Sequence, residues 1–235
     1  MKAIKNILSI CSVALLLGSC QADLLETKPY GNVAAGNMWT SENFADKGVT
    51  AIYSTLRKSY VGLGLYQMDC LGVSTDCRDA DYPIMRNTIT TSNGMFSSYW
   101  SEHYSGISRA NDAIVHLPEV DMPENKKARY MAEAKVLRAY FYYKLNIMYK
   151  GVPVYLEPVE ASECTKGQET EAAVWQVIED DLTAAINEPN LPNIYTEGSN
   201  DYGRVTKGLA YALRGKAYLY QKEYAKAAAD FEEVK

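Results

Sequence analysis

The chain has 235 residues, of which 47% are hydrophobic, and a formal net charge of −5 at pH 7. This is enough apolar sequence for a sizeable core, and mild acidity without a basic block argues against a nucleic-acid-binding protein. Tyrosine is unusually common, with 19 residues against 4 phenylalanines, and its apolar ring with a polar hydroxyl favours helix interfaces and open binding sites.

Residues 1–19 have the pattern of a bacterial lipoprotein signal peptide. Lys2 and Lys5 give a positive start, residues 7–17 are largely apolar, and small residues then precede Cys20. The apolar stretch is too short to serve as a permanent membrane-spanning helix. The pattern predicts cleavage before Cys20 and acyl chains on this residue, which together give a stable membrane anchor. The alternative is an ordinary secretory signal in which Cys20 has no special role.

Residues 20–40 are predicted to form a lipidated linker, because proline and glycine recur in them and interrupt regular structure. The folded domain is expected over residues 41–235. It begins with a helix over residues 41–60, for which Ser41 is a suitable N-cap. The predicted inward face of this helix consists of Phe44, Gly48, Ala51, Ile52, Thr55 and Leu56.

Residues 61–93 have no helical period and form a long polar segment of a kind that is usually functional or mobile. Four side chains in it could hydrogen-bond sugar hydroxyls, and we take them as candidate ligand-binding residues: Asp76, Arg78, Asp81 and Tyr82. The alternative is a solvated loop with aspartate-capped turns. A calcium loop fits less well, because the spacing lacks the glycine and the terminal glutamate of an EF-hand.

The cysteines give no disulfide framework. Cys70 and Cys77 lie in the same polar segment, where a disulfide and two free thiols are both open because the sequence does not fix their separation. Cys164 is left over. His103 and His116 are far from these cysteines in the chain and show no ligand spacing, so we expect no zinc site and no cofactor.

Residues 98–117 are predicted to form a helix that ends before Pro118. Its apolar stripe begins at Trp100, which could stack on a sugar, although this position favours core packing. Asn111 lies in mid-helix, where an amide is not intrinsically favoured. We therefore expect its side chain to bond the backbone of an adjoining loop.

The stretch of residues 130–155 is predicted to begin with a helix that has two apolar stripes, which indicates that this helix is sandwiched between neighbouring helices. The stripes consist of Ala134, Leu137, Phe141, Leu145 and Met148 and of Val136, Tyr140, Tyr143 and Ile147. Only narrow polar strips are expected, near Glu133 and Lys144 and near Lys135 and Asn146. Arg138 lies at the edge of the first stripe and must find a carboxylate or carbonyl partner.

Gly151 and Pro153 are predicted to end this helix, and residues 152–156 favour an extended conformation. The next helix covers residues 170–187, with Thr170 as its cap and an inward face of Trp175, Ile178, Leu182 and Ala185. Residues 203–235 then carry a tetratricopeptide-like pattern, in which small residues let two helices approach closely and aromatic rings fill the groove: Gly215, Tyr218, Tyr224, Ala227 and Phe231. The predicted fold is mostly all-α, a tetratricopeptide-like helical scaffold with irregular loops and little strand.

Four motifs resemble, in the same order, those of the SusD/RagB family of outer-membrane nutrient-binding lipoproteins. They are CQADLLETKPYGN, YWSEHYSGISRANDAI, AEAKVLRAYFYYKLNIMYKGVPVY and GRVTKG. The resemblance covers nearly the whole chain after residue 19 and implies a SusD-like fold. Because that family continues well beyond the point that corresponds to residue 235, we expect this chain to be the N-terminal portion of such a protein.

The resemblance implies a non-catalytic lipoprotein that is anchored through Cys20 on the outer face of the outer membrane. It would bind a nutrient oligosaccharide and deliver it to a SusC-like TonB-dependent transporter. Two alternatives are a peptide-binding RagB-like uptake lipoprotein and a helical-repeat envelope interaction module without a nutrient ligand. A glycoside hydrolase is disfavoured, because nothing in the sequence places two carboxylates across a cleft.

Overall fold

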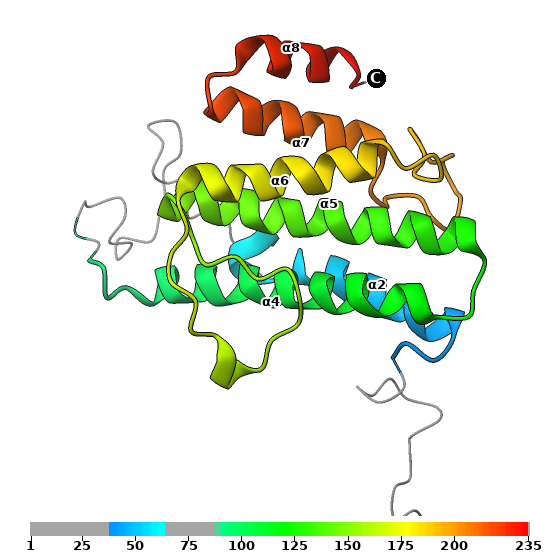
Figure 1. Cartoon of the computed structure of the whole chain (residues 1–235), viewed down its shortest axis with the longest axis horizontal. Helices are drawn as coiled ribbons and strands as arrows, with labels where there is room; N and C mark the ends of the chain where they lie inside the picture. The colour runs from blue at the N-terminus through cyan, green and yellow to red at the C-terminus, as the bar shows by residue number, and fades with distance from the viewer. Residues whose placement is uncertain (1–37, 64–87, 89, 235) are drawn as a thin grey trace, which may run out of the picture. The chain divides into compact units, whose positions relative to one another are not determined.

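The computed structural model describes residues 38–63, 88 and 90–234, and these residues contain helices but no strand (Figure 1). This confirms the predicted mostly all-α class. The α-helices are α2 (Glu42–Thr55), α4 (Gly94–His116), α5 (Glu124–Tyr149), α6 (Glu171–Ile186), α7 (Lys207–Tyr220) and α8 (Tyr224–Glu232). Three single turns accompany them, the π-helical η2 (Ser59–Leu63) and the 3-10 turns η3 (Leu117–Glu119) and η4 (Ala161–Glu163). None of the helices in this part of the chain is long and apolar enough to cross a membrane.

Helix α5 is sandwiched between other helices, as its two apolar stripes predict. It packs against α4 and α2 on one side and against α6 on the other, and α7 and α8 continue the stack beyond α6 (Figure 1). Both stripes contribute to the hydrophobic core. Val136 and Tyr143 of the second stripe are buried, and Phe141 of the first is fully buried. The hydrophobic core is therefore continuous from α2 to α7.

The helix ends follow local chemistry. Ser41 and Thr170 cap α2 and α6 as predicted, because their hydroxyls accept from backbone N–H groups of the first turns. Helix α4 begins four residues earlier than predicted, since Asn93 Oδ1 accepts from Met95 N at 2.9 Å. Helix α5 ends with Lys150 at φ 58° and Gly151 at φ 104°, and the glycine tolerates this left-handed conformation without strain.

The structure corrects the predicted inward face of α2. Gly48, Ile52 and Thr55 are buried as expected, but Phe44, Ala51 and Leu56 are only half-buried. Their places are taken by Ala45 and Val49, which are fully buried. Helix α2 contacts both α4 and α5, so two neighbouring helices rather than one determine which of its residues are buried.

The predicted polar strips of α5 are wrong at Glu133 and Asn146, because both residues are fully buried. Asn146 Nδ2 donates to the carbonyl of Glu171 at 3.1 Å, and its Oδ1 accepts from Gly151 N at 2.9 Å. Glu133 accepts from Tyr53 and Arg204. Polar side chains can be buried when hydrogen bonds offset the cost of burial. Gly151 is close to Asn146 in the chain, but Glu171, Tyr53 and Arg204 come from distant segments.

The α7–α8 hairpin has the close approach that the tetratricopeptide-like pattern predicts. A Cβ atom on Gly215 would lie 2.6 Å from Cε1 of Phe231, so the phenyl ring occupies the space that a side chain would need. Arg214 and Asp230 also join the two helices, with Nε–Oδ2 and Nη2–Oδ1 distances of 2.8 and 2.7 Å. The two helices that this bidentate pair joins lie at the far end of the stack from α4 (Figure 1).

We expect Gly106→Ala to lower the free energy of unfolding by about 1–3 kcal/mol, because the added Cβ would overpack the α4–α5 contact. It would lie 2.4 Å from Cε2 of the buried Phe141 ring. Gly94→Ala is the control, since nothing lies within 4 Å of a Cβ at that position of the same helix. Urea unfolding of both variants measures the difference, and equal midpoints would contradict this packing.

Candidate functional site

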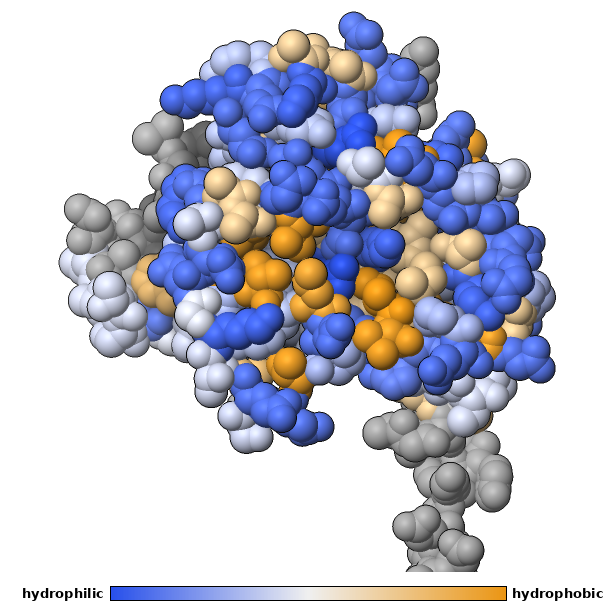
Figure 2. Space-filling model, in the orientation of Figure 1, coloured by the Kyte–Doolittle hydropathy of each residue, from blue (hydrophilic) through white to orange (hydrophobic). Residues whose placement is uncertain are grey.

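A pocket of about 420 Å³ lies between α4 and the α5–α6 loop, residues 150–170. We call it the aromatic pocket. Helix α4 contributes Trp100, Tyr104, Ile107, Ser108 and Asn111, and the loop contributes Pro153, Tyr155, Glu157, Val159, Cys164 and Lys166. Figure 2 shows hydrophobic residues gathered in the middle of one face and hydrophilic residues around them, and the loop crosses this same face in Figure 1.

Three lining aromatic rings belong to one connected cluster. Trp100 and Tyr104 lie one turn apart on α4 with ring centroids 4.9 Å apart, and Tyr155 meets Tyr104 edge to face at 6.4 Å. On its other side Trp100 meets Tyr149 edge to face at 5.0 Å. The predicted core packing of Trp100 is thus present, and its partly buried ring also lines the pocket.

The tyrosine hydroxyls in this pocket are engaged by the protein itself. Tyr104 OH donates to the carbonyl of Pro153 at 2.6 Å, and Tyr155 OH accepts from Lys166 N at 3.1 Å. Burial raises the pKa of Tyr104 well above its ordinary value, so the hydroxyl stays protonated and keeps donating. The rings are fixed by these bonds, and the pocket offers a ligand mainly their apolar surfaces.

A few polar groups remain at the rim. Lys166 Nζ donates to the carbonyl of Val154 at 2.9 Å and lies 5.2 Å from the centre of the Tyr155 ring. The Glu157 carboxylate and the Ser108 hydroxyl have no hydrogen-bond partner within the described ranges. An aromatic floor with a few convergent polar groups is the usual composition of a small-molecule site. It can hold a sugar ring by its C–H face and bond its hydroxyls.

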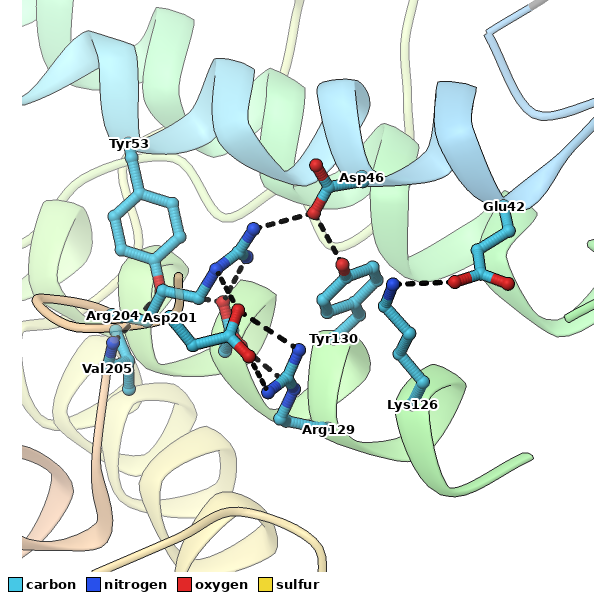
Figure 3. Close-up of polar contacts among 10 residues, drawn as sticks. Glu42, Asp46, Tyr53, Lys126, Arg129, Tyr130, Asp201, Arg204 and Val205 are labelled. Atoms are coloured by element: carbon cyan, nitrogen blue, oxygen red, sulfur yellow. Dashed lines mark hydrogen bonds and ion pairs between the residues drawn. The ribbon is translucent and has the colours of Figure 1, made fainter. Parts of the chain in front are cut away.

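A second pocket, of about 590 Å³, is polar and lies where α2, α5 and the segment before α7 meet. Its centre is Arg204, whose Nη1 donates to Glu133 Oε2 at 3.0 Å and whose Nη2 donates to Asp46 Oδ1 at 2.6 Å. Its Nε lies 3.0 Å from Asp201 Oδ1, and Asp201 also accepts from Arg129 at 2.7 Å. Figure 3 shows side chains from α2 and α5 converging on this guanidinium.

We call this set the Arg204 network: Asp46, Tyr53, Arg129, Tyr130, Glu133, Asp201 and Arg204. Burial raises the pKa of Glu133, while the Arg204 charge acts in the opposite direction. The hydrogen bond from Arg129 lowers the pKa of Asp201. Because these charges pair with one another, we interpret the network as a structural clamp between distant segments rather than as a binding site.

The predicted lipidation site and the four candidate ligand-binding residues are not among the described ones. Cys20 lies outside the described residues, and so do Cys70 and Cys77 and the four loop candidates, Asp76, Arg78, Asp81 and Tyr82. Their roles stay predictions. Cys164 is described, and its thiol is free, exposed and part of the aromatic pocket.

Sequence reasoning missed the loop side of the pocket. Tyr155, Glu157 and Lys166 follow α5 in a segment for which the only prediction is an extended conformation of residues 152–156. One signal for the site was present in the sequence, since Trp100 and Tyr104 are four residues apart and share one face of a helix. The mid-helix Asn111 predicts that a loop adjoins this helix, but nothing in the sequence indicates that the loop is residues 150–170.

Comparison with known proteins identifies the family. A SusD-like family, described as starch-binding and associating with the outer membrane, matches residues 24–219. The chain belongs to this SusD-like family. Its members are binding proteins rather than enzymes.

Individual relatives agree with this assignment. SusD-like protein P38 of Formosa agariphila is 28% identical over 236 residues, which cover 97% of this chain and 45% of that protein. A laminarin binding SusD-like protein of known structure is 36% identical with a TM-score of 0.73, over 83% of this chain and 44% of that one. Surface glycan-binding protein A from Bacteroides uniformis is 27% identical with a TM-score of 0.72, over 83% and 46%. The chain thus spans just under half the length of these relatives.

Proposed function

We propose that this SusD-like chain belongs to a cell-surface lipoprotein of the outer membrane that binds a nutrient glycan. The aromatic pocket carries this proposal. Its volume of about 420 Å³ lies within the range of small-ligand sites, and its two tyrosine rings are fixed by hydrogen bonds to the wall. The similar proteins that bind laminarin or surface glycans support the same ligand class.

The proposal extends to delivery and anchoring. The family resemblance supports a SusC-like TonB-dependent transporter as the partner that receives the glycan. The apolar run before Cys20 supports acylation of that cysteine as the membrane anchor. Co-purification of a TonB-dependent transporter with the tagged protein from outer membranes would test the partner, and its absence under conditions that preserve glycan binding would contradict it.

Calorimetry of the full-length protein against a ligand panel tests the central proposal. Laminarin heads the panel because the 36% identical relative binds it, followed by other neutral glucans, acidic polysaccharides and peptides. We expect at least one glycan to bind and the peptides not to bind. Binding of peptides alone would support the RagB-like alternative, and binding of neither class would support an interaction module.

Cys164 allows the position of the ligand to be checked. Its exposed thiol lines the aromatic pocket, so a bound glycan should slow its reaction with a thiol reagent. Mass spectrometry of the peptide that contains Cys164 separates this signal from the other cysteines. An unchanged labelling rate at saturating ligand would place the binding site elsewhere.

A further inference from the structure

The wall of the aromatic pocket is held almost entirely by side chains. Residues 153–157 lie outside helices, and their carbonyls have no regular backbone ladder. All five carbonyl oxygens nevertheless accept a hydrogen bond, from Tyr104 to Pro153, Lys166 to Val154, Asn111 to Tyr155 and to Glu157, and Arg138 to Leu156. The position of this wall therefore depends on the donors behind it.

Arg138 bonds one of these donors, Asn111, and does not itself line the pocket. Its Nη1 donates to Asn111 Oδ1 at 2.8 Å and to the carbonyl of Leu156 at 3.1 Å. The first bond fixes the orientation of the Asn111 amide, because only its oxygen can accept. Asn111 Nδ2 is thereby aimed at the carbonyls of Tyr155 and Glu157, at 2.8 and 3.2 Å.

Asp181 makes this arrangement possible in the core. Its two carboxylate oxygens accept from Nε and Nη2 of Arg138 at 2.8 and 2.7 Å, and each of the two residues is only 6% exposed. A bidentate pair both neutralises the buried guanidinium and fixes its plane. Nη1, which does not bond Asp181, is consequently held towards Asn111 on α4 and the Leu156 carbonyl of the loop.

We propose that Arg138 is a positioning residue for ligand binding, which holds the pocket wall through Asn111 and the Leu156 carbonyl. This inference rests on the proposed function of the aromatic pocket. If the wall is already ordered in the ligand-free protein, binding does not carry the entropic cost of ordering it, and the affinity for the ligand is higher. A substitution that removes hydrogen bonds of Arg138 should therefore weaken ligand binding, even though Arg138 does not touch the ligand.

Arg138→Lys and Arg214→Lys form a matched pair for the test. Arg214 binds Asp230 with the same two distances as Arg138 binds Asp181, but it lies between α7 and α8 and its remaining bond goes to Thr183. Lysine keeps the charge in both cases and loses the planar fork. Both variants should lose thermal stability to a similar degree.

Only Arg138→Lys should affect the pocket. We expect it to raise the Kd of the bound glycan by on the order of tenfold and to raise the labelling rate of ligand-free Cys164 severalfold. Arg214→Lys should leave both within about twofold of the wild-type protein. Wild-type affinity and labelling in folded Arg138→Lys would overturn the inference, and so would an equal loss of affinity in Arg214→Lys.

Asp181→Asn, with Asp230→Asn as its control, provides a second route if Arg138→Lys does not fold. The amide keeps the shape of the side chain but loses the charge that pairs with Arg138. We therefore expect a higher Kd and faster labelling of Cys164, each by a smaller factor than in Arg138→Lys. The labelling of ligand-free Cys164 needs no ligand. If the wild-type protein bound no glycan, the proposed function would fail, while this rate would still decide whether Arg138 holds the wall.

Discussion

Replacing Arg204 with methionine should lower the free energy of unfolding by about 3–5 kcal/mol at neutral pH. Methionine fills similar space but leaves Glu133, which is fully buried, without its hydrogen-bonded cation. Arg129 Nε, 3.6 Å from Glu133 Oε1, is too distant to replace that bond. The loss should appear in urea unfolding as a lower midpoint.

Two further variants decide whether the buried charge is the cause. Arg204→Met combined with Glu133→Gln should recover part of the loss, because the charge is then absent. Lys150→Met is the control, since its pair with Glu171 is 3.2 Å long and largely exposed, and it should change stability by less than about 0.5 kcal/mol. A loss in Lys150→Met as large as that in Arg204→Met would contradict the role of burial.

The cost of Arg204→Met should also depend on pH. Burial raises the pKa of Glu133 in the folded protein, and loss of Arg204 removes the main influence that lowers it. A carboxyl with a raised folded pKa favours folding fully below its unfolded pKa, and this contribution is lost as the pH rises through the folded pKa. The stability difference from wild type should therefore be smaller at about pH 5 than at about pH 8.

Replacing Trp100 with alanine should raise the Kd of the bound glycan by roughly 30-fold, or about 2 kcal/mol, if the aromatic pocket is the binding site. The change removes the largest ring of the aromatic floor and its contacts with Tyr104 and Tyr149. Calorimetry with the glycan found in the panel measures the effect. Trp100→Phe should retain part of the affinity, because it keeps an aromatic surface.

Tyr220→Ala is the matched control for Trp100→Ala. Tyr220 is 50% exposed and stacks on Trp175 at 5.9 Å, but it lies on α7 and not in the pocket. Its removal should leave the Kd within about twofold. If Trp100→Ala bound as tightly as the wild type while still folded, the glycan would have to bind at another site.

Local sequence chemistry was sufficient for the helical scaffold. Helix caps at Ser41 and Thr170 depend on a hydroxyl and the next few residues, and the stripes of α5 depend on the 3.6-residue period. The burial cost of a charge or amide also predicts that Arg138 and Asn111 need partners. The structure confirms both, through Asp181 and the loop carbonyls.

The sequence alone also determined the family, because its motifs are long runs of neighbouring residues. Only the tertiary structure decided which partners these residues have. Glu133 is charged, and the helical period places it in a polar strip, yet it is buried because Arg204, 71 residues later, folds onto it. The aromatic pocket likewise exists only because residues 150–170 return to α4. Periodicity shows which face of a helix is apolar, but which distant segment covers that face depends on the packing of the whole chain.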